Sequence, residues 1–298
     1  MLIAIAGLAS SHPFTDARIL EAAGAELVVC DDEPARLERF RGEHPGARVV
    51  PGLEEVLAAR PDGVVLTVPT PRVPAALGRL LEHDRPCFVN KPAAATRAQL
   101  AELARVVERA PHRVLTTSVL RFAPAFTAFA AALDEPAVLA AHAVVRHDVG
   151  RWARGHNPWQ DDPAEGGGMP VTMGVHGVEL LVALLGPEVR LTGASAASRH
   201  YRTLRSADTA LLGLRWGNGI AGSVTFLGAT DAESYELILH TRVGTERVVV
   251  RGGIEELGYR ATLEAFRSMV DGGPSPVPWP QTRAILEVLT EACGQFGS

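Results

Sequence analysis

Lys91 is the residue of this sequence that most needs a chemical explanation. It is the only lysine among 298 residues, and arginine supplies the rest of the positive charge. A lysine ammonium group, unlike a guanidinium group, can lose its proton near neutral pH when it is partly desolvated. Keeping one lysine in so arginine-rich a chain therefore suggests a chemical role for Lys91. The alternative, a plain surface charge, gives no reason for lysine rather than arginine.

A turn near the start of the chain could hold a phosphate group. An apolar run ends at Gly7 and a helical pattern follows, and exposed N–H groups and the helix dipole attract a pyrophosphate at such a junction. Compared with the pattern G-x-G-x-x-G, alanine replaces the second glycine and histidine the third. The predicted pyrophosphate contacts are Gly7, Leu8, Ala9, Ser10, Ser11 and His12. A strand-to-helix turn without a ligand is the alternative.

An acidic cluster closes the second apolar run of the chain. Asp31 stands where a carboxylate of a dinucleotide fold accepts hydrogen bonds from ribose hydroxyls. Asp32 and Glu33 follow it, and no arginine adjoins them in the sequence. Three carboxylates repel a 2′-phosphate, so NAD is predicted in preference to NADP. The alternative is that this cluster only caps the next helix.

The elements that position these residues follow an alternating pattern. From Leu2 to about Thr117, short β-branched runs alternate with helical patterns. The runs are continuously apolar, as expected for parallel strands covered by helices on both faces. This part is predicted to be a Rossmann-type doubly wound parallel sheet, with Lys91 at its carboxyl edge, where ligands bind in such folds.

The pattern changes after about residue 117. A helix over 125–133, a strand over 138–148 and a helix over 171–185 precede a series of strands, with a hairpin turn at Asn218-Gly219. A last helix is expected over 281–293. We therefore predict an α/β domain over 1–119 and an α+β domain over 120–298. The second domain should contain a mostly antiparallel open sheet with helices on one face, and the last helix could pack back on the first domain.

Composition narrows the class of protein. The net charge of −5 and the absence of a basic run argue against nucleic acid as a partner. The first residues lack the basic segment and the apolar length of an export signal or a membrane span, so neither is expected. Cys30, Cys87 and Cys293 form no paired motif, which is typical of reduced thiols in the cytoplasm. The histidines do not have metal-ligand spacing, and no metal is expected.

Several motifs together resemble the Gfo/Idh/MocA oxidoreductases. Asn90-Lys91-Pro92 is similar to the Glu-Lys-Pro motif of that family, and Thr67 and Pro69 lie in a segment similar to its Thr-Pro-Asn turn. The matches continue along most of the chain, at Arg121–Pro124, at Gly166–His176, and in the closing segments 259–272 and 278–292. The resemblance implies a nicotinamide-dependent oxidoreductase. It also implies that the cofactor site includes Thr67, Pro69, Asn90 and Lys91.

The resemblance assigns chemistry to two residues. Lys91 and His176 correspond to the lysine and histidine that face nicotinamide and substrate in that family. Without the resemblance, a hydrogen-bonded core histidine would be the simpler interpretation of His176. Thr172 replaces the usual catalytic-helix aspartate, Asn90 the usual glutamate, and Val73 a usual histidine. The resemblance therefore implies an atypical member with Lys91 as acid or base. In it, either His176 acts chiefly in substrate binding, or Thr172 holds a hydroxyl or water in place of a carboxylate.

The loop before the histidine helix is the expected source of substrate contacts. It gathers polar and aromatic groups that suit a small polyhydroxylated or carboxylated molecule. The candidates for substrate contact are Arg121, Arg146, His147, Asp148, Arg151, Trp159, Gln160, Met173 and His176. A solvated or dimer-facing loop is the alternative. A homodimer or homotetramer is expected to form through the second sheet, chiefly by resemblance.

The leading functional hypothesis is NAD-dependent hydride transfer to or from a secondary alcohol, carbonyl or imine of a sugar, cyclitol or related polar metabolite. A redox-neutral lyase, epimerase or hydrolase that uses bound NAD is a second hypothesis. A non-catalytic sensing or scaffolding protein with a decayed site is the third, because of the missing glycines and Thr172.

Overall fold

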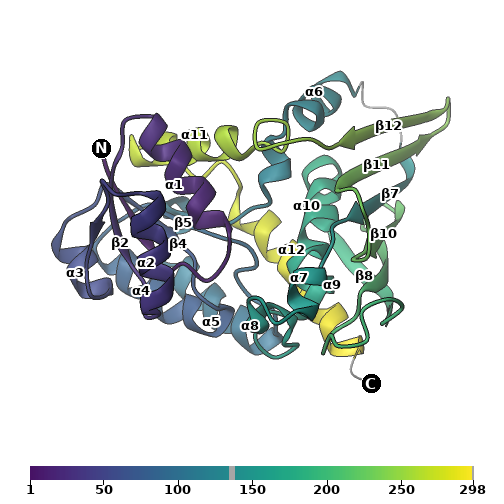
Figure 1. Ribbon diagram of the computed structural model, residues 1–298. Coiled ribbons are helices and arrows are strands. Elements are labelled where there is room, and N and C mark those ends of the chain that lie inside the picture. Colours follow the sequence, from purple (N-terminus) through teal and green to yellow (C-terminus); the bar gives the residue numbers. More distant parts are fainter. Residues whose placement is uncertain (134–137, 297–298) are drawn as a thin grey trace. The chain divides into compact units, whose positions relative to one another are not determined.

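The chain divides into two compact units (Figure 1). The computed structural model describes residues 1–133 and 138–296. Unit 1 comprises Met1–Ala93, Ala101–Thr116 and Thr262–Trp279, and unit 2 comprises Ala94–Leu100, Thr117–Ala261 and Pro280–Ser298. The chain thus passes between units several times, in contrast to the single boundary expected after residue 119.

Unit 1 contains a six-stranded sheet in the order β3-β2-β1-β4-β5-β6, and every pair in it is parallel. Its strands are β1 Leu2–Ala6, β2 Glu26–Cys30, β3 Arg48–Val49, β4 Gly63–Leu66, β5 Cys87–Val89 and β6 Val114–Leu115. The central strands β1, β4 and β5 are buried almost throughout, because helices cover them. The predicted doubly wound parallel sheet is confirmed.

The helices of unit 1 follow the strands in alternation. They are α1 His12–Ala22, α2 Pro34–Glu43, α3 Leu53–Ala58, α4 Val73–Glu82, most of α5 Arg97–Val107 and most of α11 Tyr259–Val270, with the short turns η1 Thr70–Arg72 and η2 Pro111–Arg113. Helix α11 packs against the start of β4. A Cβ atom on Gly63 would lie 2.5 Å from Val270 Cγ2 and 2.9 Å from the ring of Phe266. A segment far along the chain therefore completes the core of unit 1.

Unit 2 contains a second six-stranded sheet, in the order β12-β11-β7-β10-β9-β8. Its strands are β7 Val138–Arg146, β8 Val189–Ala197, β9 Thr209–Trp216, β10 Ala221–Leu227, β11 Ser234–Thr241 and β12 Thr245–Val250. Only the central pair β7 and β10 is parallel, so the predicted mostly antiparallel sheet is confirmed. The predicted hairpin turn, with Gly219 at φ +93°, joins β9 to β10.

The helices of unit 2 include the apolar helix α10 (Gly174–Leu185), which packs on the sheet. They are α6 Pro124–Ala132, α7 Gly150–Ala153, α8 Pro158–Asp161, α9 Gly168–Thr172, α10 Gly174–Leu185 and most of α12 Trp279–Phe296, with the turn η3 Val119–Phe122. A Cβ atom on Gly177 would lie 2.4 Å from Val224 Cγ1, so α10 approaches β10 closely. The helix predicted over 171–185 starts earlier and is interrupted at Met173.

Residues 168–185 are long and apolar enough to cross a membrane. They are the only such helical run found in the described part of the chain. However, 83% of this run is buried inside the protein, as is usual for a core helix. The run is therefore only weak evidence for a membrane span.

A buried carboxylate lies among the central elements of unit 1. Asp16 of α1 is 1% exposed, and Asn90 Nδ2 donates a hydrogen bond to its Oδ2 atom at 3.2 Å. The same Nδ2 group donates to Thr67 Oγ1 at 2.6 Å, so one amide links α1 to the ends of β4 and β5. Burial raises the pKa of Asp16 to about 7, although the hydrogen bond from Asn90 opposes this.

The contact between Gly63 and α11 gives a first prediction. In the Gly63→Ala variant, Val270 or Phe266 has to move, and we expect the free energy of unfolding to fall by about 1–3 kcal/mol. Gly42 is the matched control, because it lies in α2 with no heavy atom within 4 Å of a Cβ. Gly42→Ala should raise stability slightly. Thermal unfolding of both variants checks this, and a Gly63→Ala protein as stable as the wild type would contradict the packing.

Asp16 gives a second prediction. Its pKa is about 7 in the folded protein against 3.8 for an unperturbed aspartate, so the folded state binds the proton more tightly. Asp16 therefore favours folding at low pH, and this advantage is lost as pH rises from about 4 to about 7. Asp16→Asn does not titrate. The wild type should lose stability relative to Asp16→Asn across this window, by at most about 4 kcal/mol. Chemical unfolding at pH 5 and pH 8 tests this, and a constant difference would contradict it.

Candidate functional site

The turn after β1 is held against the end of β4. Gly7 has φ +91°, and a Cβ atom on it would lie 2.3 Å from the carbonyl oxygen of Thr67. Only glycine fits here, for both reasons. The N–H of Ala9 donates to the same Thr67 oxygen at 3.1 Å. The one glycine that remains of the expected pattern is therefore the one that this turn requires.

Asp31 holds the turn from the other side. Its Oδ2 atom accepts a hydrogen bond from the N–H of Leu8 at 2.6 Å, and its Oδ1 atom accepts one from the N–H of Glu33 at 2.8 Å. Glu33 is the N-cap residue of α2, so Asp31 also orders the start of that helix. A carboxylate has about four lone-pair positions, so these two bonds leave capacity to accept ribose hydroxyls. The two interpretations of the acidic cluster are therefore compatible.

A cavity of about 370 Å³ opens at this edge of the sheet. Five of the residues predicted to bind a cofactor line it: Gly7, Ala9, Asp31, Thr67 and Pro69. The side chain of Leu8 is buried, whereas Ser10, Ser11 and His12 reach the surface at the start of α1. Because the N–H groups of Leu8 and Ala9 bond within the protein, Ser10 and Ser11 are the residues of the turn best placed to donate to a phosphate.

Two arginines also line this cavity, which corrects one expectation. Arg36 Nε lies 2.9 Å from Glu33, and Arg72 Nη1 lies 2.5 Å from Asp32. Sequence adjacency missed both, because Arg36 comes one turn later in α2 and Arg72 comes from the η1 turn after β4. The acidic cluster is therefore partly neutralised, and charge repulsion alone does not decide between NAD and NADP.

Asn90 and Lys91 follow β5 in unit 1. Lys91 is 8% exposed, and the amide of Asn90 bonds to Asp16 and Thr67. Neither residue is among those that line the 370 Å³ cavity. The position of Lys91 just beyond the carboxyl end of β5 is the one expected from the strand pattern.

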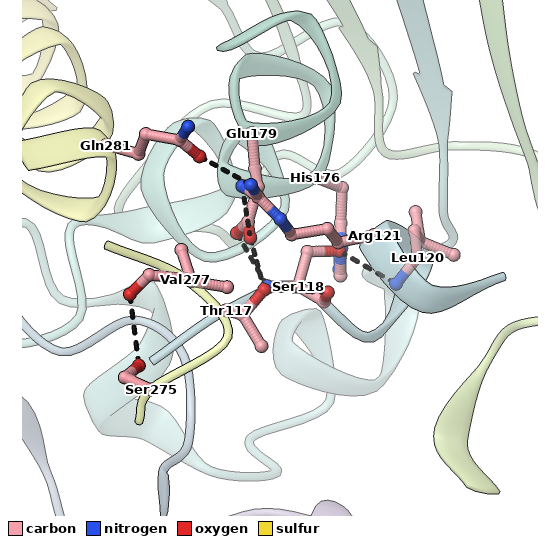
Figure 2. Close-up of polar contacts among 9 residues, drawn as sticks. All are labelled: Thr117, Ser118, Leu120, Arg121, His176, Glu179, Ser275, Val277 and Gln281. Carbon is pink, nitrogen blue, oxygen red and sulfur yellow. Dashed lines mark hydrogen bonds and ion pairs between the residues drawn. The ribbon is translucent and has the colours of Figure 1, made fainter. Parts of the chain in front are cut away.

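In unit 2, polar side chains meet around Glu179 of α10 (Figure 2). Glu179 is 2% exposed. The hydroxyl of Thr117 donates to its Oε1 atom, and the N–H of Ser118 donates to its Oε2 atom at 2.6 Å. Arg121 Nη1 lies 3.8 Å from Oε1. Burial raises the pKa of Glu179 to about 7, although Arg121, Thr117 and Ser118 oppose this.

His176 lies one turn before Glu179 and is 3% exposed. Its Nδ1 atom is 2.6 Å from Ser118 Oγ, and which of the two donates depends on the tautomer. The ring of Tyr235 packs edge-on against the His176 ring, with 5.1 Å between centroids. The Tyr235 hydroxyl lies 3.2 Å from His147 Nδ1. Tyr235 therefore connects two of the predicted substrate residues.

The other predicted residues of unit 2 are mostly engaged within the protein. The hydroxyl of Thr172 donates to the carbonyl of Gly168 at 2.7 Å, inside α9. Arg121 donates to Gln281 at 2.5 Å. Trp159, Gln160 and Met173 are buried, and Arg146 and Arg151 are exposed.

The expected substrate loop is fastened to residues 199–207. The Tyr201 hydroxyl donates to Asp148 at 2.5 Å, and Asp161 accepts the N–H groups of Arg205 and Ser206. Asp148 therefore has a structural partner in addition to the substrate role expected for it. The two loops hold each other in place.

Sequence reasoning missed Asp16, Ser118 and Glu179. A signal existed for Glu179, because it is the one charged residue in the apolar helix α10 and stands three residues after His176. Asp16 gave a weaker signal, as an acid on the buried side of α1. Nothing local distinguishes Ser118 before its partners are known.

Comparisons with known proteins agree with this architecture. Residues 137–251 match the family described as the GFO/IDH/MocA C-terminal domain. A search of curated proteins found no sequence match.

Three solved structures illustrate the likeness in fold. A myo-inositol dehydrogenase from Corynebacterium glutamicum has a TM-score of 0.82 at 18% identity, covering 100% of this chain and 96% of that one. The WlbA dehydrogenase from Bordetella pertussis, in complex with NADH and UDP-GlcNAcA, scores 0.83 at 17% identity over 99% and 95%. A mutant of KijD10, a 3-ketoreductase from Actinomadura kijaniata in complex with TDP-benzene and NADP, scores 0.75 at 17% identity over 98% and 96%.

The likeness in fold to these structures extends over nearly the whole of this chain. The match in sequence lies within unit 2. Residues 137–251 match the GFO/IDH/MocA C-terminal domain family, in agreement with the resemblance that the motifs indicated.

Proposed function

We propose that the protein is an NAD-dependent oxidoreductase of the Gfo/Idh/MocA type. The observation that carries this proposal is the cavity of unit 1, where Asp31 and the Gly7 turn meet at the carboxyl edge of a parallel sheet. The family match and the nucleotides bound in two of the similar structures support it.

The residues around the cavity suit a dinucleotide. Asp31 has acceptor capacity for ribose hydroxyls, and Ser10 and Ser11 offer donors at the start of α1. NAD, when bound, would supply the hydride acceptor or donor. We favour NAD over NADP because Asp31 can accept a hydrogen bond from the ribose 2′-hydroxyl of NAD, and the excess of three carboxylates over two arginines adds to this preference.

The proposed substrate is a sugar, cyclitol or related polar metabolite with a secondary alcohol, carbonyl or imine. Similar structures include an inositol dehydrogenase and a dehydrogenase in complex with a nucleotide sugar, which supports this class. We assign proton transfer to Lys91, supported by its burial and its position after β5. We assign substrate binding and a share of the proton to His176, whose ring is fixed by Ser118 and Tyr235.

We also propose that two copies of the chain associate through the outer face of the second sheet. Val144 of β7, Thr225 of β10 and Leu211 of β9 form one cross-strand row, and Leu211 is 46% exposed. Val144 and Leu211 are the apolar members of this row, and exposed apolar side chains on an open sheet face suit a self-complementary interface.

The first experiment is calorimetric titration of the protein with NAD, NADH, NADP and NADPH. We expect micromolar or tighter binding of NAD(H) and weaker binding of NADP(H). The absence of binding by all four nucleotides would overturn the proposed function. Myo-inositol with NAD is the first substrate probe.

Lys91 gives a third prediction. Lys91→Ala should lower kcat by about 100-fold or more, because the acid or base is lost, while the Kd for NADH stays unchanged. Added ethylamine should restore part of the rate by supplying an amine to the vacated position. A variant with full activity would refute the assignment, and a loss of activity that ethylamine does not restore would leave Lys91 without the role of proton carrier.

The arginine pairs give a fourth prediction. Asp32→Ser should free the Arg72 guanidinium, which can then bind a 2′-phosphate. We expect the affinity for NADP relative to NAD to rise by about tenfold, or about 1.4 kcal/mol. The double variant Asp32→Ser/Arg72→Ala is the matched control and should lose this gain. Equal preference ratios in the wild type and in Asp32→Ser would show that Arg72 does not reach the ribose end of the nucleotide.

A further inference from the structure

Glu179 is a carboxylate buried in an apolar helix, and the proposed reaction does not use it directly. Burying a charged group without partners is unfavourable, so the contacts that it makes have to be considered together. Among the described residues of unit 2, its partners come from residues 117–121: the Thr117 hydroxyl, the Ser118 N–H and the Arg121 guanidinium. Glu179 therefore fixes one short stretch of chain between β6 and α6.

Ser118 is the link between Glu179 and His176. Its N–H donates to Glu179, and its Oγ atom lies 2.6 Å from Nδ1 of His176. The same Oγ atom accepts the N–H of Leu120 at 3.2 Å. Because this oxygen already accepts one hydrogen bond, its own hydrogen is suited to donate to Nδ1. A neutral His176 would then carry its proton on Nε2.

The contact with the backbone outweighs the ion pair in fixing Glu179. The carboxylate lies 2.6 Å from the Ser118 nitrogen but 3.8 Å from Arg121, and Arg121 also donates to Gln281 of α12. Arg121 is the charged group that faces Glu179 from outside its own helix, and His176 is the titratable group one turn before it. A carboxylate that served only as a counter-ion would be expected closer to the guanidinium.

We propose that Glu179 is a positioning residue for His176. Its carboxylate fixes the Thr117–Ser118 backbone, so that the Ser118 hydroxyl meets Nδ1 and selects the tautomer protonated on Nε2. Proton exchange with a substrate is then assigned to Nε2. The proposal rests on the proposed function only in that His176 acts on a substrate.

The hydrogen bond that the Thr172 hydroxyl makes agrees with this proposal. Its hydroxyl donates to Gly168 within α9, so the residue four positions before His176 brings no carboxylate and directs its hydroxyl to its own helix. A carboxylate acts instead from three positions after His176, through Ser118. Burial raises the pKa of Glu179 to about 7. The charge of this carboxyl group can therefore change near neutral pH.

Nuclear magnetic resonance of protein with ring-¹⁵N-labelled histidine tests the proposal without a substrate. His176→Gln identifies the His176 signals. In the wild type we expect one tautomer, with Nδ1 as a hydrogen-bond acceptor. Ser118→Ala and Glu179→Gln should both shift the Nδ1 signal toward a mixture of tautomers. Asp208→Asn is the matched control, because Asp208 is also fully buried in unit 2 and accepts backbone N–H groups, but from residues 199–201. It should leave the His176 signals unchanged.

An unchanged His176 tautomer in Glu179→Gln, with a changed one in Ser118→Ala, would overturn the proposal. If Glu179→Gln does not fold, Thr117→Val replaces it, because this variant removes one of the two hydrogen bonds that orient the carboxylate. With myo-inositol and NAD, Ser118→Ala and Glu179→Gln should lower kcat by about tenfold with KM unchanged. Failure of the wild type to bind NADH would overturn the proposed function, whereas the tautomer measurement decides the role of Glu179 independently.

Discussion

The hydrogen bond from the N–H of Leu8 to the carboxylate of Asp31 is the constraint on which the candidate nucleotide site depends. Together with the hydrogen bond from the N–H of Gly7 to the carbonyl of Cys30, it ties the turn after β1 to the end of β2. The N–H of Ala9 ties the same turn to Thr67 at the end of β4. Three strand ends are thereby held around one cavity. In the full glycine pattern, the second and third glycines allow close approach to pyrophosphate and close packing of the helix. Here Ala9 gives its N–H to the protein, so the turn is ordered before any nucleotide binds.

The sequence predicted those parts of the site that depend on strand ends. Carboxyl ends of parallel strands meet at one edge of a sheet, so Gly7 and Asp31 could be placed together from the strand pattern, whereas Thr67 came from the family resemblance. The hairpin at Asn218-Gly219 was predictable because Asn-Gly between two strand patterns is a strong local turn signal. The turn that forms encloses residues 217–219, with the N–H of Trp216 bonded to the carbonyl of Ile220. These predictions need only local patterns and the rules for connecting parallel strands.

Other parts of the site depend on which side chains face each other after folding. Asp16 and Asn90 are 74 residues apart, and Ser118 and Glu179 are 61 apart. Arg72 faces Asp32 because β2 and β4 flank β1 in the sheet, and the segments after these two strands meet beyond the end of β1. To predict such pairs, one has to know the register of the helices against the sheet. The hydrophobic pattern fixes this register only to within one helical turn.

The two buried carboxylates, Asp16 and Glu179, serve in the same way, through the hydrogen bonds that they accept. Asp16 and Glu179 both have their pKa raised to about 7 by burial, so neither favours folding as an ionised group. An apolar side chain at either position would avoid the cost of desolvation. What each carboxylate provides is a fixed hydrogen bond, from the Asn90 amide in unit 1 and from the Ser118 N–H in unit 2. Asn90 and Thr172 are the positions where the motif resemblance implies a glutamate and an aspartate. In unit 1 the Asp16 carboxylate accepts a hydrogen bond from the neutral Asn90, and in unit 2 the Glu179 carboxylate accepts one from Ser118. In both units, therefore, a carboxylate from another position in the sequence orients a neutral residue.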